Sequence, residues 1–239
     1  MLKAVFFDMY ETLVSLYKVE PYLGWHISRD MGVPEPIFRK VWDPSEAERT
    51  VGKSTTEGII ERIMRDNGVY SKELYDKIIA KRYASQRRAF VKLNDEIIPM
   101  LEALKKRGIK LGVISNCFSE EAMIIKESAL AAHFDVLCLS YDLGVCKPDA
   151  RIFEKALDNI SRVSGSKILP EDCLFVGDGG SRELQSSSSF GMKAVQAVWY
   201  INESLKLPIP GIENKVSKIM PEFPQVESPM EILKYLEKS

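Results

Sequence analysis

Short apolar runs that alternate with helical patterns most constrain the fold of this sequence. The apolar runs are Ala4–Phe7, Lys110–Ile114, Val136–Leu139, Cys173–Val176 and Ala194–Val198. The helical patterns between them are Asp95–Arg107, Ser119–Ala131, Ala150–Ser161 and Arg182–Phe190. Apolar runs of this length are typical of buried strands, and their alternation with helices predicts an α/β fold with helices on both faces of one parallel sheet.

The segment 16–91 interrupts this alternation. It carries helical patterns and no convincing strand, and the clearest patterns are Pro21–Met31, Thr56–Asn67 and Ser71–Phe90. We therefore predict an all-helical domain inserted after the first strand, with the core domain formed by residues 1–15 and 92–239. Because the insert leaves the core at a strand end, we expect it to cap the strand ends. A closing helix is predicted at Pro229–Lys238.

Polar side chains stand where three of the predicted strands end. These residues are Asp8, Ser115 and Asp178, and Thr12 follows Asp8 by one helical turn. In an open parallel sheet ligands bind beyond the carboxyl ends of the strands, so we expect these side chains to converge. Asp8 is placed to act as a carboxylate nucleophile, and the hydroxyls of Thr12 and Ser115 to donate to an anionic group.

The composition excludes some classes of partner. Lys and Arg number 33 against 34 acidic residues, so the chain lacks the basic excess typical of nucleic-acid binding. No run approaches the ~20 apolar residues of a membrane span, and the apolar start is too short for a signal peptide. We expect a cytoplasmic protein whose four cysteines are reduced, since they form no CxxC pair. The sequence does not indicate an oligomeric state.

Taken in chain order, the polar residues resemble the four motifs of the haloacid dehalogenase superfamily with a helical, C1-type cap. The matching segments are Phe7–Leu13, Ile114–Asn116, Lys147–Asp149 and Val176–Gly180 with Glu183. The resemblance covers nearly the whole core. It implies a Rossmann-like core and a hydrolase that forms a covalent aspartyl-enzyme intermediate through Asp8.

The resemblance also implies roles for the later motifs. Lys147 would supply positive charge to the nucleophile and to an incoming anion. Asp178, one oxygen of Asp8 and the backbone carbonyl of Tyr10 resemble the family's Mg²⁺ site, a ligand set that magnesium favours. Glu183 stands where the family often has aspartate. Its side chain is expected to reach either a metal-bound water or Lys147, with an exposed position on the helix as the alternative.

Tyr10 bears on which of two branches of the family the chain resembles, the phosphatases or the 2-haloacid dehalogenases. Phosphatases use a carboxylate at this position as a proton shuttle, and a phenol with a pKa near 10 is a poor base at neutral pH. The 2-haloacid dehalogenases resemble this chain here, because they carry an aromatic residue and release halide unprotonated. They need no metal, however, and Asp178 would then be an idle carboxylate facing Asp8.

Five further residues are candidates for contact with the substrate. Tyr10 and Asn116 belong to the first two motifs. In the predicted cap, Lys53 lies in a turn that resembles the specificity loop of capped relatives, and Arg49 precedes that turn. Arg39 matches an early cap arginine that binds carboxylate or halide in the dehalogenases. For these cap residues an ordinary solvated position is the alternative.

We therefore expect a Mg²⁺-dependent phosphohydrolase that acts on a small anionic phosphorylated metabolite. A substrate with a good leaving group would tolerate the missing proton shuttle. The alternatives are a 2-haloacid dehalogenase, favoured by Tyr10, and a catalytically quiet binding or regulatory protein that kept the fold.

Overall fold

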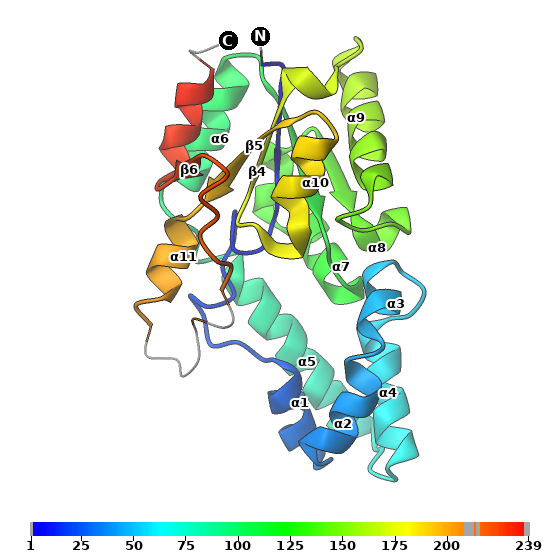
Figure 1. Cartoon of the computed structure of the whole chain (residues 1–239). Helices are drawn as coiled ribbons and strands as arrows, with labels where there is room; N and C mark the ends of the chain where they lie inside the picture. Colours follow the sequence, from blue (N-terminus) through cyan, green and yellow to red (C-terminus); the bar gives the residue numbers. More distant parts are fainter. Residues whose placement is uncertain (1, 208–212, 214–215, 237–239) are drawn as a thin grey trace.

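Six strands form one parallel sheet in the computed structural model of the protein, which describes residues 2–207, 213 and 216–236 (Figure 1). In spatial order the strands are β3 (Val136–Leu139), β2 (Lys110–Ser115), β1 (Ala4–Phe7), β4 (Cys173–Gly177), β5 (Lys193–Ala197) and β6 (Gln225–Val226). Phe7 pairs with Val113 on one side and with Val176 on the other. The residues that follow β1, β2 and β4 therefore start from the same edge of the sheet.

Helices cover both faces of the sheet, as predicted. Alternate residues of a strand point to opposite faces, so Val5 and Phe7 pack on one side and Ala4 and Phe6 on the other. The first face is covered by α6 (Ile97–Lys106), α7 (Ser119–Glu127) and the 3₁₀ helix η5 (Pro229–Tyr235). The second face is covered by α9 (Ala150–Ser164) and α10 (Glu183–Ser189). Burial on both faces explains why most residues of the central strands are apolar.

Five helices form a cap inserted between β1 and β2. They are α1 (Gly24–Met31), α2 (Glu35–Trp42), α3 (Glu46–Thr50), α4 (Thr56–Asp66) and α5 (Lys72–Ala89). The cap has an apolar core of its own, in which Phe38, Ile60 and Ile63 are fully buried. In Figure 1 it lies beyond the end of the sheet opposite the chain's N-terminus. Contacts of α5 with α7 and of α3 with α8 (Ser140–Leu143) join it to the core.

The remaining short elements connect the strands. They are η1 (Ala129–His133), η2 (Pro170–Asp172), η3 (Gly180–Arg182) and α11 (Trp199–Ser204). Within the described ranges, no helix combines the length and apolar character needed to cross a bilayer.

Several predicted elements need correction. The helix expected over Ser119–Ala131 stops at Glu127, because Ser128 is extended and a 3₁₀ turn follows. The closing helix is a 3₁₀ helix over Pro229–Tyr235, and residues 237–239 lie outside the described part. Five observed elements were not predicted from the sequence: α2, α3, α8, α11 and β6. Each has at most eight residues, too few for a clear periodic pattern.

Candidate active site

Asp8 lies at the edge of the sheet, directly after the central strand β1. Its backbone N–H donates to the carbonyl of Val176 at 2.9 Å, so the ladder between β1 and β4 holds it next to the end of β4. The residue is 8% exposed. Lys147, from the loop between α8 and α9, donates to Oδ1 of Asp8 at 2.6 Å. The structure thus brings together the first and third predicted motifs.

Lys147 is buried between two carboxylates. Besides Asp8 it contacts the carboxylate of Glu183, which is itself fully buried at the start of α10. Burial lowers the pKa of Lys147, but the two neighbouring carboxylates outweigh this and raise the pKa above its ordinary value. The lysine is therefore a fixed positive charge. Of the positions expected for Glu183, contact with Lys147 is confirmed and an exposed helix position is wrong.

Asn116 holds the backbone of Lys147. Its side-chain oxygen accepts from the backbone N–H of Lys147 at 2.8 Å, and its amide nitrogen donates to the carbonyl of Lys147 at 3.0 Å. The two hydrogen bonds fix the loop that aims the lysine. A direct contact of Asn116 with substrate stays a prediction.

The two carboxylates that contact Lys147 lie close to a third, that of Asp178. Oxygen atoms of Asp8, Asp178 and Glu183 all lie within 4.8 Å of one another. Burial raises the pKa of both Asp178 and Glu183, and the charge of Asp8 raises them further. With all three acids ionised and one lysine, the cluster carries a net charge of −2 in a buried position. A divalent cation would neutralise it, and carboxylate oxygens are the ligands that Mg²⁺ prefers, so this donor set fits the cation.

Thr12 and Ser115 are both fully buried. Among the described residues the Thr12 hydroxyl has no hydrogen-bond partner. Within the described part of the chain, the Ser115 hydroxyl donates only a long hydrogen bond, 3.3 Å, to the carbonyl of Asn116. Buried hydroxyls normally have good partners, so both of these keep unused hydrogen-bonding capacity. The indole of Trp199, at the start of α11, donates to the carbonyl of Thr12 at 2.9 Å and fixes the loop after β1.

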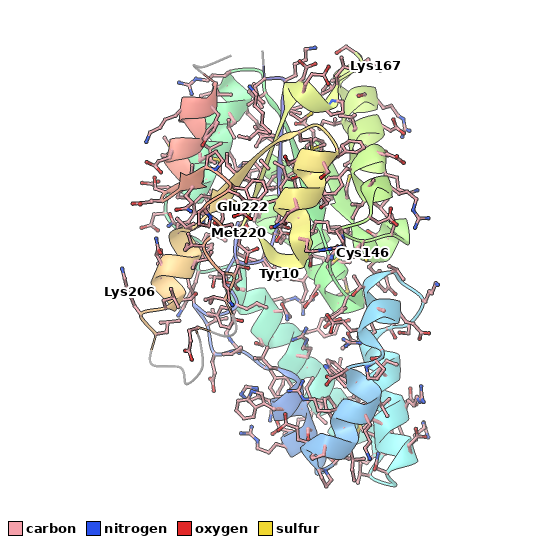
Figure 2. All side chains as sticks on the ribbon, viewed as in Figure 1. Tyr10, Cys146, Lys167, Lys206, Met220 and Glu222 are labelled. Carbon is pink, nitrogen blue, oxygen red and sulfur yellow. The ribbon has the colours of Figure 1, made fainter. Side chains whose placement is uncertain are left out.

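The side chain of Tyr10 meets the cap. Its ring packs edge-on against Phe90 with centroids 6.4 Å apart, and Figure 2 labels it where the core meets the cap helices. Its hydroxyl is buried without a hydrogen-bond partner among the described residues. Burial raises the pKa of Tyr10, and the charge of Glu121 adds to this. The phenol therefore stays protonated and does not replace the proton shuttle as a base.

Glu11 closes the turn after Tyr10. Its carboxylate accepts from the Ser15 hydroxyl at 2.7 Å and from the backbone N–H of Leu16 at 2.9 Å. Burial raises the pKa of Glu11 to about 7 although these hydrogen bonds oppose the shift. The backbone of Glu11 has φ = +56°, a conformation that costs a non-glycine residue about 1 kcal/mol or more.

Among the described residues, neither the cap arginine nor the cap lysine predicted to contact substrate pairs with the lysine–carboxylate cluster, and substrate contact by either stays a prediction. Arg39 has a side chain 42% exposed and pairs with Glu35 and Asp43 on its own helix. Lys53 is exposed in the turn after α3. Arg49, by contrast, is 1% exposed, and its guanidinium lies 3.9 Å from the ring of Trp42.

A buried charged cluster that the sequence analysis missed joins cap to core. Arg82 of α5 donates to Glu120 and Glu121 of α7, each at 2.9 Å, and to the carbonyl of Tyr22 at 3.1 Å. Burial and the neighbouring Glu120 raise the pKa of Glu121 to about 7. The pair Glu120-Glu121 looks in sequence like ordinary acids in the first turn of a helix, so no local pattern indicates this contact.

The approach of Glu183 to the end of β4 depends on Gly177. A Cβ atom placed at Gly177 would lie 2.1 Å from Oε1 of Glu183. We expect Gly177→Ala to displace this carboxylate from Lys147 and to lower the free energy of unfolding by about 1–3 kcal/mol, as overpacking does. Urea unfolding measures the change.

The shorter side chain of Glu183→Asp provides the control for this substitution. In that background Gly177→Ala should cost distinctly less, because the carboxylate no longer reaches the added methyl group. An equal cost in both backgrounds would show that the steric conflict lies elsewhere.

A Rossmann-like core beneath a helical cap, with a buried lysine–carboxylate cluster at the edge of its sheet, defines a class of capped α/β hydrolases. The chain belongs to the haloacid dehalogenase-like hydrolases, whose family model matches residues 2–191.

Sequence relatives include phosphatases. The chain is 25% identical over 209 residues to a phosphoglycolate phosphatase of Aquifex aeolicus, covering 87% of this chain and 90% of that protein. It is 26% identical over 183 residues to a phosphoserine phosphatase of Thermus thermophilus, covering 76% of this chain and 70% of that protein.

Solved structures from both branches share the fold. A 2-haloacid dehalogenase from Pseudomonas syringae superposes with a TM-score of 0.67 at 20% identity, covering 100% of this chain and 99% of that one. A HAD phosphatase from Thermococcus onnurineus gives 0.62 at 19% identity, covering 98% of each chain. At these identities the structures establish the fold and do not separate the two activities.

Proposed function

We propose that the protein is a Mg²⁺-dependent phosphohydrolase that acts on a small anionic phosphorylated metabolite. The observation that carries the proposal is the excess of buried carboxylates, since Asp178 and Glu183 lie beside Asp8 with Lys147 as the only cation in direct contact among the described residues. A halide-releasing site needs one nucleophilic carboxylate. The phosphatases among the sequence relatives support the same choice.

The residues of the chain suit an aspartyl nucleophile. Lys147 donates to Oδ1 of Asp8, and this hydrogen bond leaves Oδ2 to attack phosphorus. As the O–P bond forms, the bond to the leaving oxygen breaks. Water then attacks phosphorus, releases inorganic phosphate and restores the Asp8 carboxylate. The hydroxyls of Thr12 and Ser115 donate to the phosphoryl oxygens during both steps.

Asp8, Asp178 and the backbone carbonyl of Tyr10 would hold the Mg²⁺ ion, which neutralises charge on the phosphoryl group when bound. Glu183 keeps Lys147 in place behind this set. Tyr10 does not protonate the leaving oxygen, because the raised pKa of its phenol makes it a weak acid. Substrates whose leaving group departs as an anion, such as acyl phosphates, are therefore favoured over simple alkyl esters.

A substrate screen with and without a chelator tests this proposal. The panel contains phosphoglycolate, phosphoserine, nucleoside monophosphates, acyl phosphates and 2-haloacids. We expect phosphate release that falls by at least about 10²-fold when Mg²⁺ is removed, since the cation stabilises the charge that develops in the transition state. Halide release that a chelator does not affect would instead establish the dehalogenase, which Tyr10 favours. If no compound in the panel is turned over, the catalytically inactive binding or regulatory protein is favoured.

A further inference from the structure

A segment from the C-terminal part of the chain lies on the turn that carries Asp178. We call residues 216–220 the strap. The hydroxyl of Ser217 donates to Oδ2 of Asp178 at 2.5 Å, and the backbone N–H of Gly180 donates to Oδ1 at 3.0 Å. Both carboxylate oxygens thus have a protein donor, which fixes the rotation of the carboxylate. Each oxygen keeps a second lone pair for another partner.

Gln196 ties the strap to this turn. It is fully buried in β5, and its amide nitrogen donates to the carbonyl of Asp178 at 2.8 Å and to the carbonyl of Lys218 at 2.7 Å. Its side-chain oxygen accepts from the backbone N–H of Met220 at 2.8 Å. A single buried amide therefore joins the Asp178 turn on one side to the strap on the other.

The turn after Asp178 is shaped to receive the strap. Gly179 has φ = +105°, which favours glycine, and a Cβ atom there would lie 2.6 Å from the sulfur of Met220. At Gly180 a Cβ atom would lie 3.8 Å from the Ser217 hydroxyl. Figure 2 labels Met220 in the same part of the molecule as Tyr10. The strap therefore packs on the turn at two successive glycines.

We infer that Ser217 and Gln196 are positioning residues that set the Asp178 carboxylate for a divalent cation. The inference rests on the metal site of the proposed function and deepens it. Hydrogen-bond partners of ligating carboxylates orient the ligand before the cation arrives, and their loss typically weakens metal binding by about 10–100-fold. Because the strap comes from the part of the chain after β5, the cation site would include residues beyond the four motifs.

Titration calorimetry with MgCl₂ alone, without substrate, tests this role. We expect Ser217→Ala to bind Mg²⁺ about tenfold more weakly than the unaltered chain, at an unchanged thermal unfolding midpoint. Ser217→Thr keeps the hydroxyl and should restore the affinity. The matched control is Ser128→Ala, which removes a half-buried hydroxyl that donates to the Ile125 carbonyl at 2.7 Å, far along the chain from the cluster.

Hydrogen exchange tests the second positioning residue. Gln196→Glu puts an oxygen in place of the amide nitrogen that donates to the carbonyls of Asp178 and Lys218. Both hydrogen bonds should then be lost, and the strap should detach from the Asp178 turn. We expect faster exchange of the Met220 amide and weaker Mg²⁺ binding in this variant at pH 8.

The outcomes separate this inference from the proposed function. Weaker Mg²⁺ binding by Ser217→Ala, with Ser128→Ala unchanged, supports the strap even if no phosphate ester is hydrolysed. Equal Mg²⁺ binding by Ser217→Ala and the unaltered chain overturns the strap while leaving the metal-dependent hydrolase intact. An unaltered chain that binds no Mg²⁺ overturns both the strap and the metal dependence.

Discussion

Asp8→Asn should lower the turnover of any phosphate ester that the protein accepts by about 10⁴-fold or more. An asparagine amide has nearly the shape of the carboxylate but cannot form an aspartyl-phosphate. Lys147 would still lie beside the position, so binding of the substrate phosphate should survive better than the chemical step. Steady-state kinetics on the preferred substrate, with Mg²⁺ present, measures the loss as a fall in kcat.

A matched control for this substitution is Asp142→Asn. Asp142 lies on α8 and pairs at the surface with Lys126, with its side chain 37% exposed. Its replacement removes the same charge from the chain and should change kcat less than about twofold, because surface pairs contribute little. An Asp8→Asn protein that retained more than a few per cent of the activity would mean that another group attacks phosphorus.

Lys147→Ala should cost about 3–5 kcal/mol in the free energy of unfolding, as the loss of one partner of a buried ion pair does. Lys147 contacts Asp8 and Glu183 directly, and Asp178 lies within the same cluster. Without it three buried carboxylates repel one another with no cation between them. Urea unfolding in the presence of a chelator measures the change without compensation by bound metal.

A double-mutant cycle separates this electrostatic effect from lost packing. Glu183→Gln removes one of the three negative charges, so the double variant with Lys147→Ala should be more stable than the sum of the single effects predicts. The exposed Lys126→Ala should cost less than about 1 kcal/mol. Additive single effects would indicate that Lys147 stabilises the protein through its alkyl chain.

The arrangement of the core and its central contacts could be predicted from the sequence. Strands buried on both faces are predominantly apolar runs, and the five expected strands begin and end within one residue of the observed ones. Parallel strands share one carboxyl edge, so Asp8 and Asp178 had to lie near each other. The contact of Lys147 with Asp8 followed from the motif order rather than from any local pattern.

Other parts of the site depend on contacts that leave no local signal. Gln196 is a polar residue inside a strand, and only the fold shows that its amide meets the Asp178 turn and the strap. Ser217 lies in a stretch without periodicity. Arg39 occupies the expected place in the cap, yet its guanidinium pairs with neighbours on its own helix. The position of a cap residue in the sequence therefore does not predict whether its side chain faces the lysine–carboxylate cluster.

The place of β1 in the sheet also bears on how the chain folds. β1 precedes β2 and β4 in the chain yet lies between them in the sheet, and the whole cap separates it in sequence from β2. Its hydrogen bonds are therefore non-local, whereas the cap helices pack on one another within a single continuous stretch of the chain. Because local contacts form before distant ones, the cap should become ordered early. The strand that carries Asp8 would then be left without β4 until synthesis has passed residue 177.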